Sequence, residues 1–176
     1  MDTLQEWADY YQKMGIFTFP SNQEFNWNDW RSISEAQKTY QTVFWSKASG
    51  MVGVAGIKGL RVLHIKNLKD KDVLYKKQLI QKMLGLLGLQ RYPWVFYSSD
   101  SVSILIETPD DQGSKKSKKE ENIELLWQNK FYIPCKDSTI SFYYNALPLD
   151  KPAHISSELL IICYNVLKEE LCNTTG

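Results

Sequence analysis

Basic side chains are concentrated in one stretch of the sequence and are the residues best suited to bind phosphate. Residues 51–100 contain nine Lys and Arg but only three acidic residues, a balance of +6, although the whole chain has a formal net charge of +1. Such a cluster could neutralise nucleic-acid phosphates and release their counterions. The simpler interpretation is the solvated face of an amphipathic helix and its loop. The candidate nucleic-acid contacts are Lys58, Arg61, Lys66, Lys69, Lys76 and Lys77.

His64 offers a second kind of chemistry, because three serines (Ser99, Ser101 and Ser103) follow it in the sequence. A histidine beside a serine would imitate the base and nucleophile of a hydrolase. The sequence has no nucleophile elbow and no identifiable acid to orient the histidine, which argues against this interpretation. The glycines of residues 53–59 precede a predicted strand and not a helix, so they are not a dinucleotide-binding fingerprint.

Length and composition predict a single folded domain over residues 1–176, since 43% of the residues are hydrophobic. Three cysteines without a C-x-x-C pair favour reduced thiols and a cytoplasmic location. The N-terminus lacks the layout of a signal peptide, and no stretch approaches the ~20 apolar residues of a membrane span. We expect no structural metal and no membrane partner. Whether further domains follow residue 176 stays open.

Periodicity and turn signals predict an α+β domain with a mixed or antiparallel central sheet flanked by helices. Helices are expected from an Asp2 cap to Gly15, from an Asp72 cap to about Leu89, and over 158–171. Residues 109–121 are polar and Lys-rich and are predicted to form a flexible surface loop. The predicted strands are 16–19, 51–55, 60–65, 94–98, 102–108, 122–128, 131–133 and 139–145.

Four segments, in order, resemble motifs of one known family. The first is Ala8-x-x-Tyr11-x-x-x-Gly15-x-x-x-x-Pro20, which is followed by tryptophans at Trp27 or Trp30 and at Trp45. The second is a Gly-rich strand at 52–59 that leads into Leu60-Arg-Val-Leu-His64-Ile-Lys66. The third is Pro93-Trp-Val-Phe-Tyr-Ser-Ser-Asp-Ser-Val-Ser103, and the fourth is Ile123-Glu124 with a following Pro134. Over roughly residues 8–150, the chain resembles the N-terminal domain of bifunctional DNA primase/polymerases, in the archaeo-eukaryotic primase superfamily.

The resemblance implies a catalytic site that this chain lacks in part. The family places two acids one residue apart on a strand, a third carboxylate on another strand and a His on a hairpin, for two-metal attack on a nucleotide. Here the two acids are replaced by His64 and Lys66, and the hairpin His is replaced by Ser103. Glu124 alone is retained. Lys66 would repel a divalent ion by a few kcal/mol at ~4–6 Å, so a pseudoenzyme is implied.

Two interpretations of His64 and Lys66 remain open. They could form a cationic floor that binds an anion directly, without a metal. Alternatively, they could be the result of drift after catalysis was lost, with Glu124 paired to Lys66 or His64 as a salt bridge in place of a metal site.

Three functions follow as hypotheses. The first is a catalytically degenerate primase/polymerase-like domain that binds DNA, or assembles with replication proteins, in the replication of a mobile element or phage. The second is an active nucleotidyltransferase that uses Mg²⁺ or Mn²⁺ on displaced acids (Asp70, Asp100, Glu107 or Glu124); a cofactor is expected only in this case. The third is a protein-interaction domain whose cleft is filled by side chains.

Overall fold

The structure is a computed structural model that describes residues 1–24, 37–38, 40–108 and 117–173. Its helices are α1 (Leu4–Lys13), α3 (Val73–Leu86) and α4 (Ser157–Asn173), with short 3-10 turns at Trp45–Lys47 and Ile57–Gly59. The strands are β1 (Thr18–Phe19), β2 (Val52–Val54), β3 (Leu60–Ile65), β4 (Val95–Tyr97), β5 (Val102–Glu107), β6 (Lys118–Lys119), β7 (Ile123–Leu126), β8 (Lys130–Tyr132) and β9 (Ser141–Phe142). Within the described residues, no helix combines the length and apolar character that crossing a membrane requires.

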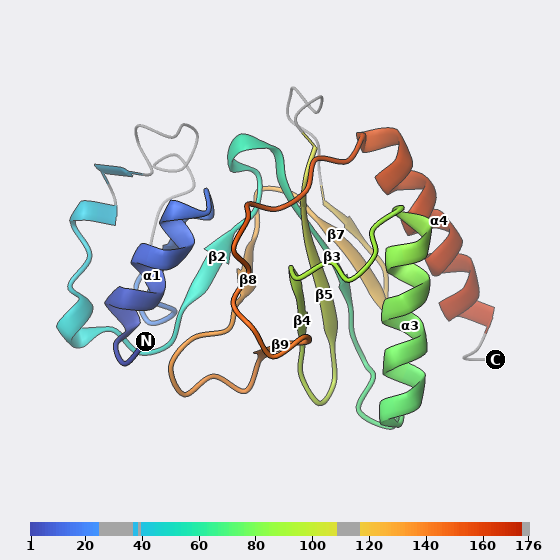
Figure 1. The fold of residues 1–176 in the computed structure, drawn as a ribbon, viewed down its shortest axis with the longest axis horizontal. Coiled ribbons are helices and arrows are strands. Elements are labelled where there is room, and N and C mark those ends of the chain that lie inside the picture. The colour runs from blue at the N-terminus through green and yellow to red at the C-terminus, as the bar shows by residue number, and fades with distance from the viewer. Residues whose placement is uncertain (25–36, 39, 109–116, 174–176) are drawn as a thin grey trace.

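The strands form two antiparallel sheets, which confirms the α+β class with an antiparallel central sheet. The central sheet has six strands in the order β6-β7-β3-β5-β4-β9, and a smaller sheet has the order β1-β2-β8. In Figure 1, α3 and α4 lie on one side of the central sheet, and the small sheet with α1 lies on the other. The second sheet was not expected as a separate layer.

Close packing between β2 and β8 holds the small sheet together. Gly53 is paired with Phe131, and a Cβ atom added at Gly53 would lie 2.6 Å from Cζ of the Phe131 ring. Only a residue without a side chain therefore leaves room for the ring. Phe131 belongs to the same buried cluster as the strands of the central sheet, so this contact also joins the two sheets.

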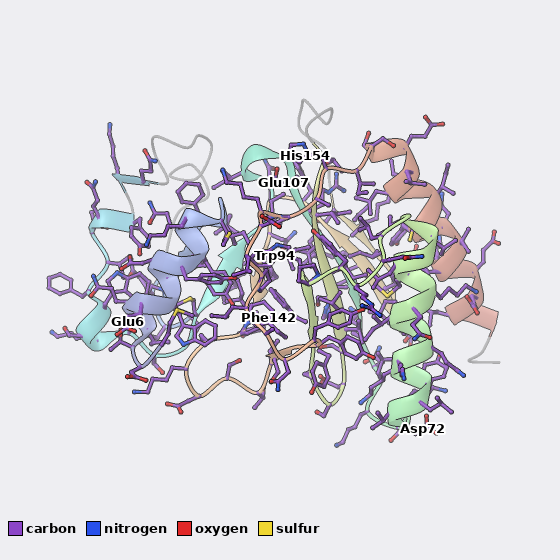
Figure 2. The ribbon with its side chains drawn as sticks, in the orientation of Figure 1. Glu6, Asp72, Trp94, Glu107, Phe142 and His154 are labelled. Atoms are coloured by element: carbon purple, nitrogen blue, oxygen red, sulfur yellow. The ribbon has the colours of Figure 1, made fainter. Side chains whose placement is uncertain are left out.

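Aromatic rings fill the interior between α1 and the central sheet. Trp94 is fully buried, and its ring centroid lies 6.1 Å from that of Phe142 and 6.4 Å from that of Tyr10 (Figure 2). The hydroxyl of Tyr11 donates a hydrogen bond of 2.5 Å to the carbonyl of Pro134. Burial of these rings anchors α1 to strands that lie more than 80 residues away in sequence.

The helix starts agree with the sequence at α3 and differ by one residue at α1. Asp72 caps α3 as predicted, because its Oδ1 accepts a hydrogen bond of 2.8 Å from the Tyr75 amide. At α1 the cap is Thr3 and not Asp2: the Thr3 hydroxyl accepts from the Glu6 amide at 3.1 Å. The Glu6 carboxylate reaches back to the Asp2 amide at 3.2 Å, so Asp2 lies outside the helix.

The predicted hairpin and the predicted polar loop have different outcomes. Strands β4 and β5 pair as expected, and Ser98 and Ser101 close the turn through a backbone hydrogen bond of 2.9 Å. Residues 109–116 of the predicted loop lie outside the described part, as do Trp27 and Trp30. The rest of that loop corrects the prediction, because Lys118–Lys119 form β6 and pair with β7 at the edge of the sheet.

Candidate functional site

The register of the central sheet brings three of the four motif positions side by side. His64 on β3 is opposite Ser103 on β5 and, across its other edge, opposite Glu124 on β7. Side chains alternate between the faces of a strand, so all three project from one face. Lys66 follows β3 by one residue, and its ammonium meets Glu124 on this same face.

These four side chains line a cavity of about 630 Å³ between the two sheets. The turn between β4 and β5 contributes Asp100 and Ser101 to its wall. The opposite wall is made by all three residues of β8 (Lys130–Tyr132) and by residues 138–140. The cleft is therefore open and is not filled by side chains. Its volume is within the range of small-molecule sites.

Two short polar contacts define the floor of this cavity, which we call the motif cleft. Nδ1 of His64 and Oγ of Ser103 are 2.7 Å apart, and Nζ of Lys66 donates to Oε1 of Glu124 at 2.8 Å. The Lys66 side chain is 34% exposed and the Glu124 side chain 17%. The second contact is the salt bridge that the sequence offered as a replacement for a metal site.

Burial keeps His64 neutral near pH 7. Desolvation lowers the pKa of His64 below its usual value of 6.5, and the positive charge of Lys66 lowers it further. The carboxylates of Glu124 and Asp100 act in the opposite direction, but do not outweigh these effects. A neutral imidazole has one donor and one acceptor nitrogen, so it can hydrogen-bond to Ser103 and still face a ligand.

The motif positions do not fit the divalent cation that the resemblance implies. Mg²⁺ needs several hard oxygen ligands, whereas the retained carboxylate, Glu124, is already neutralised by Lys66 at 2.8 Å. Among the described residues, no three His, Cys, Asp or Glu side chains are grouped so that they could hold a metal ion.

Arg61 corrects the prediction of a phosphate contact. Its side chain is 3% exposed; Nε donates to the carbonyl of Leu126 at 3.2 Å, and the guanidinium lies 4.9 Å from the centre of the Trp127 ring. Arg61 is separated from His64 by an odd number of positions, so it projects from the other face of β3. The guanidinium charge of Arg61 is therefore buried inside the fold and does not contribute to the surface.

Three of the other predicted contacts, Lys69, Lys76 and Lys77, follow β3 in the chain and do not line the motif cleft. Lys69 and Lys77 are exposed but do not line the motif cleft. Lys76 donates to the carbonyl of Ser99 at 2.6 Å, beside the turn that forms part of the cleft wall. The side chain of Lys58 lies outside the described part of the structure. The structure thus brings Lys66 into the cleft and leaves Lys69, Lys76 and Lys77 outside it.

The four displaced acids are also separated by the fold. Asp100 and Glu124 line the motif cleft, whereas Asp70 does not. Glu107 is at the far end of β5, where its Oε2 lies 2.8 Å from Nε2 of His154 (Figure 2). Sequence reasoning missed Lys130–Tyr132 and residues 138–140, because only the meeting of the two sheets places them opposite His64.

Comparison with known proteins gave no match, either to a protein-family model or to a curated protein. The resemblance to primase/polymerase domains therefore rests on the residues named above.

Proposed function

We propose that this chain is a catalytically degenerate primase/polymerase-like domain that binds DNA through the motif cleft, as a binding or assembly module in the replication of a phage or mobile element. The observation that carries the proposal is the convergence of His64, Lys66, Ser103 and Glu124 in one open cavity. These positions lie in three separate segments, and the family motif alone singles them out in the sequence. Their meeting supports the alignment on which the functional proposal depends.

The binding mechanism replaces a metal by protein donors. Lys66, Ser101 and Ser103 line the cavity, where an ammonium and hydroxyl groups would receive a phosphate. A phosphate would compete with Glu124 for Lys66, and the neutral His64 would add one hydrogen bond. Exposed Lys69 and Lys77, which lie outside the cleft, would attract the DNA backbone only at longer range, through the overall field of the protein.

DNA binding measured by fluorescence anisotropy tests this proposal. We expect a labelled single strand of about 20 nucleotides to bind, with an affinity that falls as salt rises. Lys66→Glu should weaken binding by at least about tenfold, whereas the matched charge reversal Lys151→Glu, at an exposed residue outside the cleft, should have little effect. Equal loss in both variants, or no binding by the unaltered chain, would contradict the proposal.

A second candidate is an active nucleotidyltransferase, which is favoured by the presence of both Asp100 and Glu124 in the motif cleft. Primer synthesis or extension with Mg²⁺ or Mn²⁺ that is lost in Glu124→Ala would support it. A chain that binds DNA equally well in the presence of a chelator and extends no primer would exclude it.

A further inference from the structure

Among the residues that the structure describes, no strand pairs with the edge of β8 that borders the motif cleft. In the small sheet the neighbour of β8 is β2, and β8 is the last strand in the order β1-β2-β8. The cleft is lined by Lys130, Phe131 and Tyr132 together. Consecutive residues of a strand project from opposite faces, so a cavity that touches all three must lie along the edge of the strand.

The hydrogen-bond pattern of β2 shows which peptide groups face that edge. The amide of Val54 donates a hydrogen bond of 3.0 Å to the carbonyl of Phe17, the residue before β1. The backbone groups of Val54 therefore point toward β1 and away from β8. The partner of Val54 on β8 is Lys130, and the partner of Val52 is Tyr132. In an antiparallel ladder the hydrogen-bonded pairs alternate with non-hydrogen-bonded pairs.

Two residues of β8 therefore direct their backbone amide and carbonyl groups away from β2. The hydrogen-bonded pair is therefore Gly53 with Phe131. Two residues further along each strand, the amide of Ala55 donates a hydrogen bond of 2.8 Å to the carbonyl of Asn129, as this alternation requires. It follows that the amide and carbonyl groups of Lys130 and Tyr132 face outward. The carbonyl of Lys130 and the amide of Tyr132 lie next to each other on that edge, as an acceptor beside a donor.

We propose that this acceptor–donor pair binds the Watson–Crick edge of one unpaired nucleobase of the bound strand, an inference that rests on the proposed function. Each of the four bases carries a donor next to an acceptor on that edge, so the pair binds any base and reads no sequence. Lys66 and His64 on the opposite wall are then placed to meet the phosphate of the same nucleotide. In a duplex this edge of the base is already paired, so the site selects single strands.

An extended peptide is the competing occupant of a free strand edge. Here β8 is three residues long and offers outward groups at two positions, which is a short ladder for a peptide. The opposite wall carries an ammonium, an imidazole and hydroxyl groups, which suit a phosphate better than an apolar side chain. Both features favour a nucleotide.

Amide hydrogen exchange of the full chain, followed by NMR, tests the inference directly. In the free protein the Tyr132 amide should exchange rapidly, because it faces the cleft. A thymidine oligonucleotide of about ten nucleotides should slow its exchange, whereas an abasic strand with the same phosphates should not. The abasic strand should also bind about tenfold more weakly. A Tyr132 amide that is already protected in the free protein would mean that another chain segment or copy covers the edge, and would overturn the inference.

A matched pair of variants isolates the amide itself. Tyr132→Val and Tyr132→Pro both remove the ring, but only proline removes the outward N–H, and proline is tolerated at such an edge position. We expect the proline variant to lose the preference for the thymidine strand over the abasic strand, and the valine variant to keep it. If the thymidine and abasic oligonucleotides perturb the NMR signals of His64 and Lys66 equally and the Tyr132 amide never responds, the proposed base site is contradicted but phosphate binding is supported. If neither strand perturbs these signals, the proposed function fails as well.

Discussion

The ammonium of Lys66 donates a hydrogen bond of 2.8 Å to the carboxylate of Glu124, although the two residues are 58 positions apart in the sequence. They meet because β3 and β7 are neighbours in the central sheet. Both residues stand at positions that the proposed resemblance assigns to metal-binding acids. As a consequence, the ammonium of Lys66, one of the lysines that line the motif cleft, is paired with an internal anion.

Neutralising that anion should strengthen DNA binding. In Glu124→Gln the Lys66 ammonium keeps a hydrogen-bond partner of similar shape but loses the competing charge. We expect the affinity for a labelled single strand to rise by about fivefold, with a steeper dependence on salt. Anisotropy titrations at two salt concentrations measure both effects. An active metal-dependent enzyme would show the opposite result, a loss of function in this variant.

His64 should make stability depend on pH in a defined window. Burial lowers its pKa in the folded protein, so the unfolded chain binds more protons as the pH falls below about 6.5. Stability should therefore decrease from pH 6.5 down to the folded pKa, where the loss is complete. Urea unfolding of the unaltered chain and of His64→Gln at pH 7.5 and 5.5 provides the comparison. The variant should lose less stability over this range; an equal loss in both proteins would show that His64 contributes nothing.

Arg61 should be a structural residue and not a DNA contact. Arg61→Met removes the hydrogen bond to the Leu126 carbonyl and the contact with the Trp127 ring. We expect a decrease in the free energy of unfolding of about 2–3 kcal/mol, with unchanged DNA affinity for the folded protein. Thermal unfolding followed by circular dichroism and anisotropy on the same samples separates the two effects. Weaker DNA binding without a loss of stability would contradict this prediction and show that Arg61 contributes to DNA binding.

Gly53 should be intolerant of even one methyl group. In Gly53→Ala the new Cβ would collide with the Phe131 ring, so we expect destabilisation by about 1–3 kcal/mol and a displaced β8. The control is Gly85→Ala in α3, where the added Cβ would lie within 4 Å of no described atom other than those of its chain neighbours and its own helix backbone. That variant should be more stable by about 0.5–1 kcal/mol, because alanine favours a helix. Chemical unfolding of both variants measures the change in the free energy of unfolding, which should be a decrease for Gly53→Ala and an increase for Gly85→Ala.

The sequence was most informative where the pattern is local or periodic. Asp72 caps α3 as predicted, and the period of β3 together with the two neighbouring strands brings His64, Ser103 and Glu124 together. The same alternation along β3 also indicates where the Arg61 side chain lies. Arg61 shares its face of β3 with the fully buried Leu63 and Ile65, and this pattern alone indicates burial.

The rest of the cleft depends on contacts between distant segments. No local pattern indicates that Lys130–Tyr132 would leave the central sheet and pair with β2, because this pairing depends on Gly53 making room for Phe131. The one-residue difference at the start of α1 arises because Thr3 and Asp2 are both good caps, and the position of Glu6 selects Thr3.

DNA affinity in the presence of a metal chelator tests the central claim most directly, measured for the unaltered chain, for Lys66→Met and for Lys151→Met. We expect the unaltered chain and Lys151→Met to bind a single strand equally well with and without the chelator. Lys66→Met should bind about tenfold more weakly, with a salt dependence reduced by about one phosphate contact. Binding that requires Mg²⁺ or Mn²⁺, or that is unaffected by the loss of Lys66, would contradict a metal-independent phosphate site in the motif cleft.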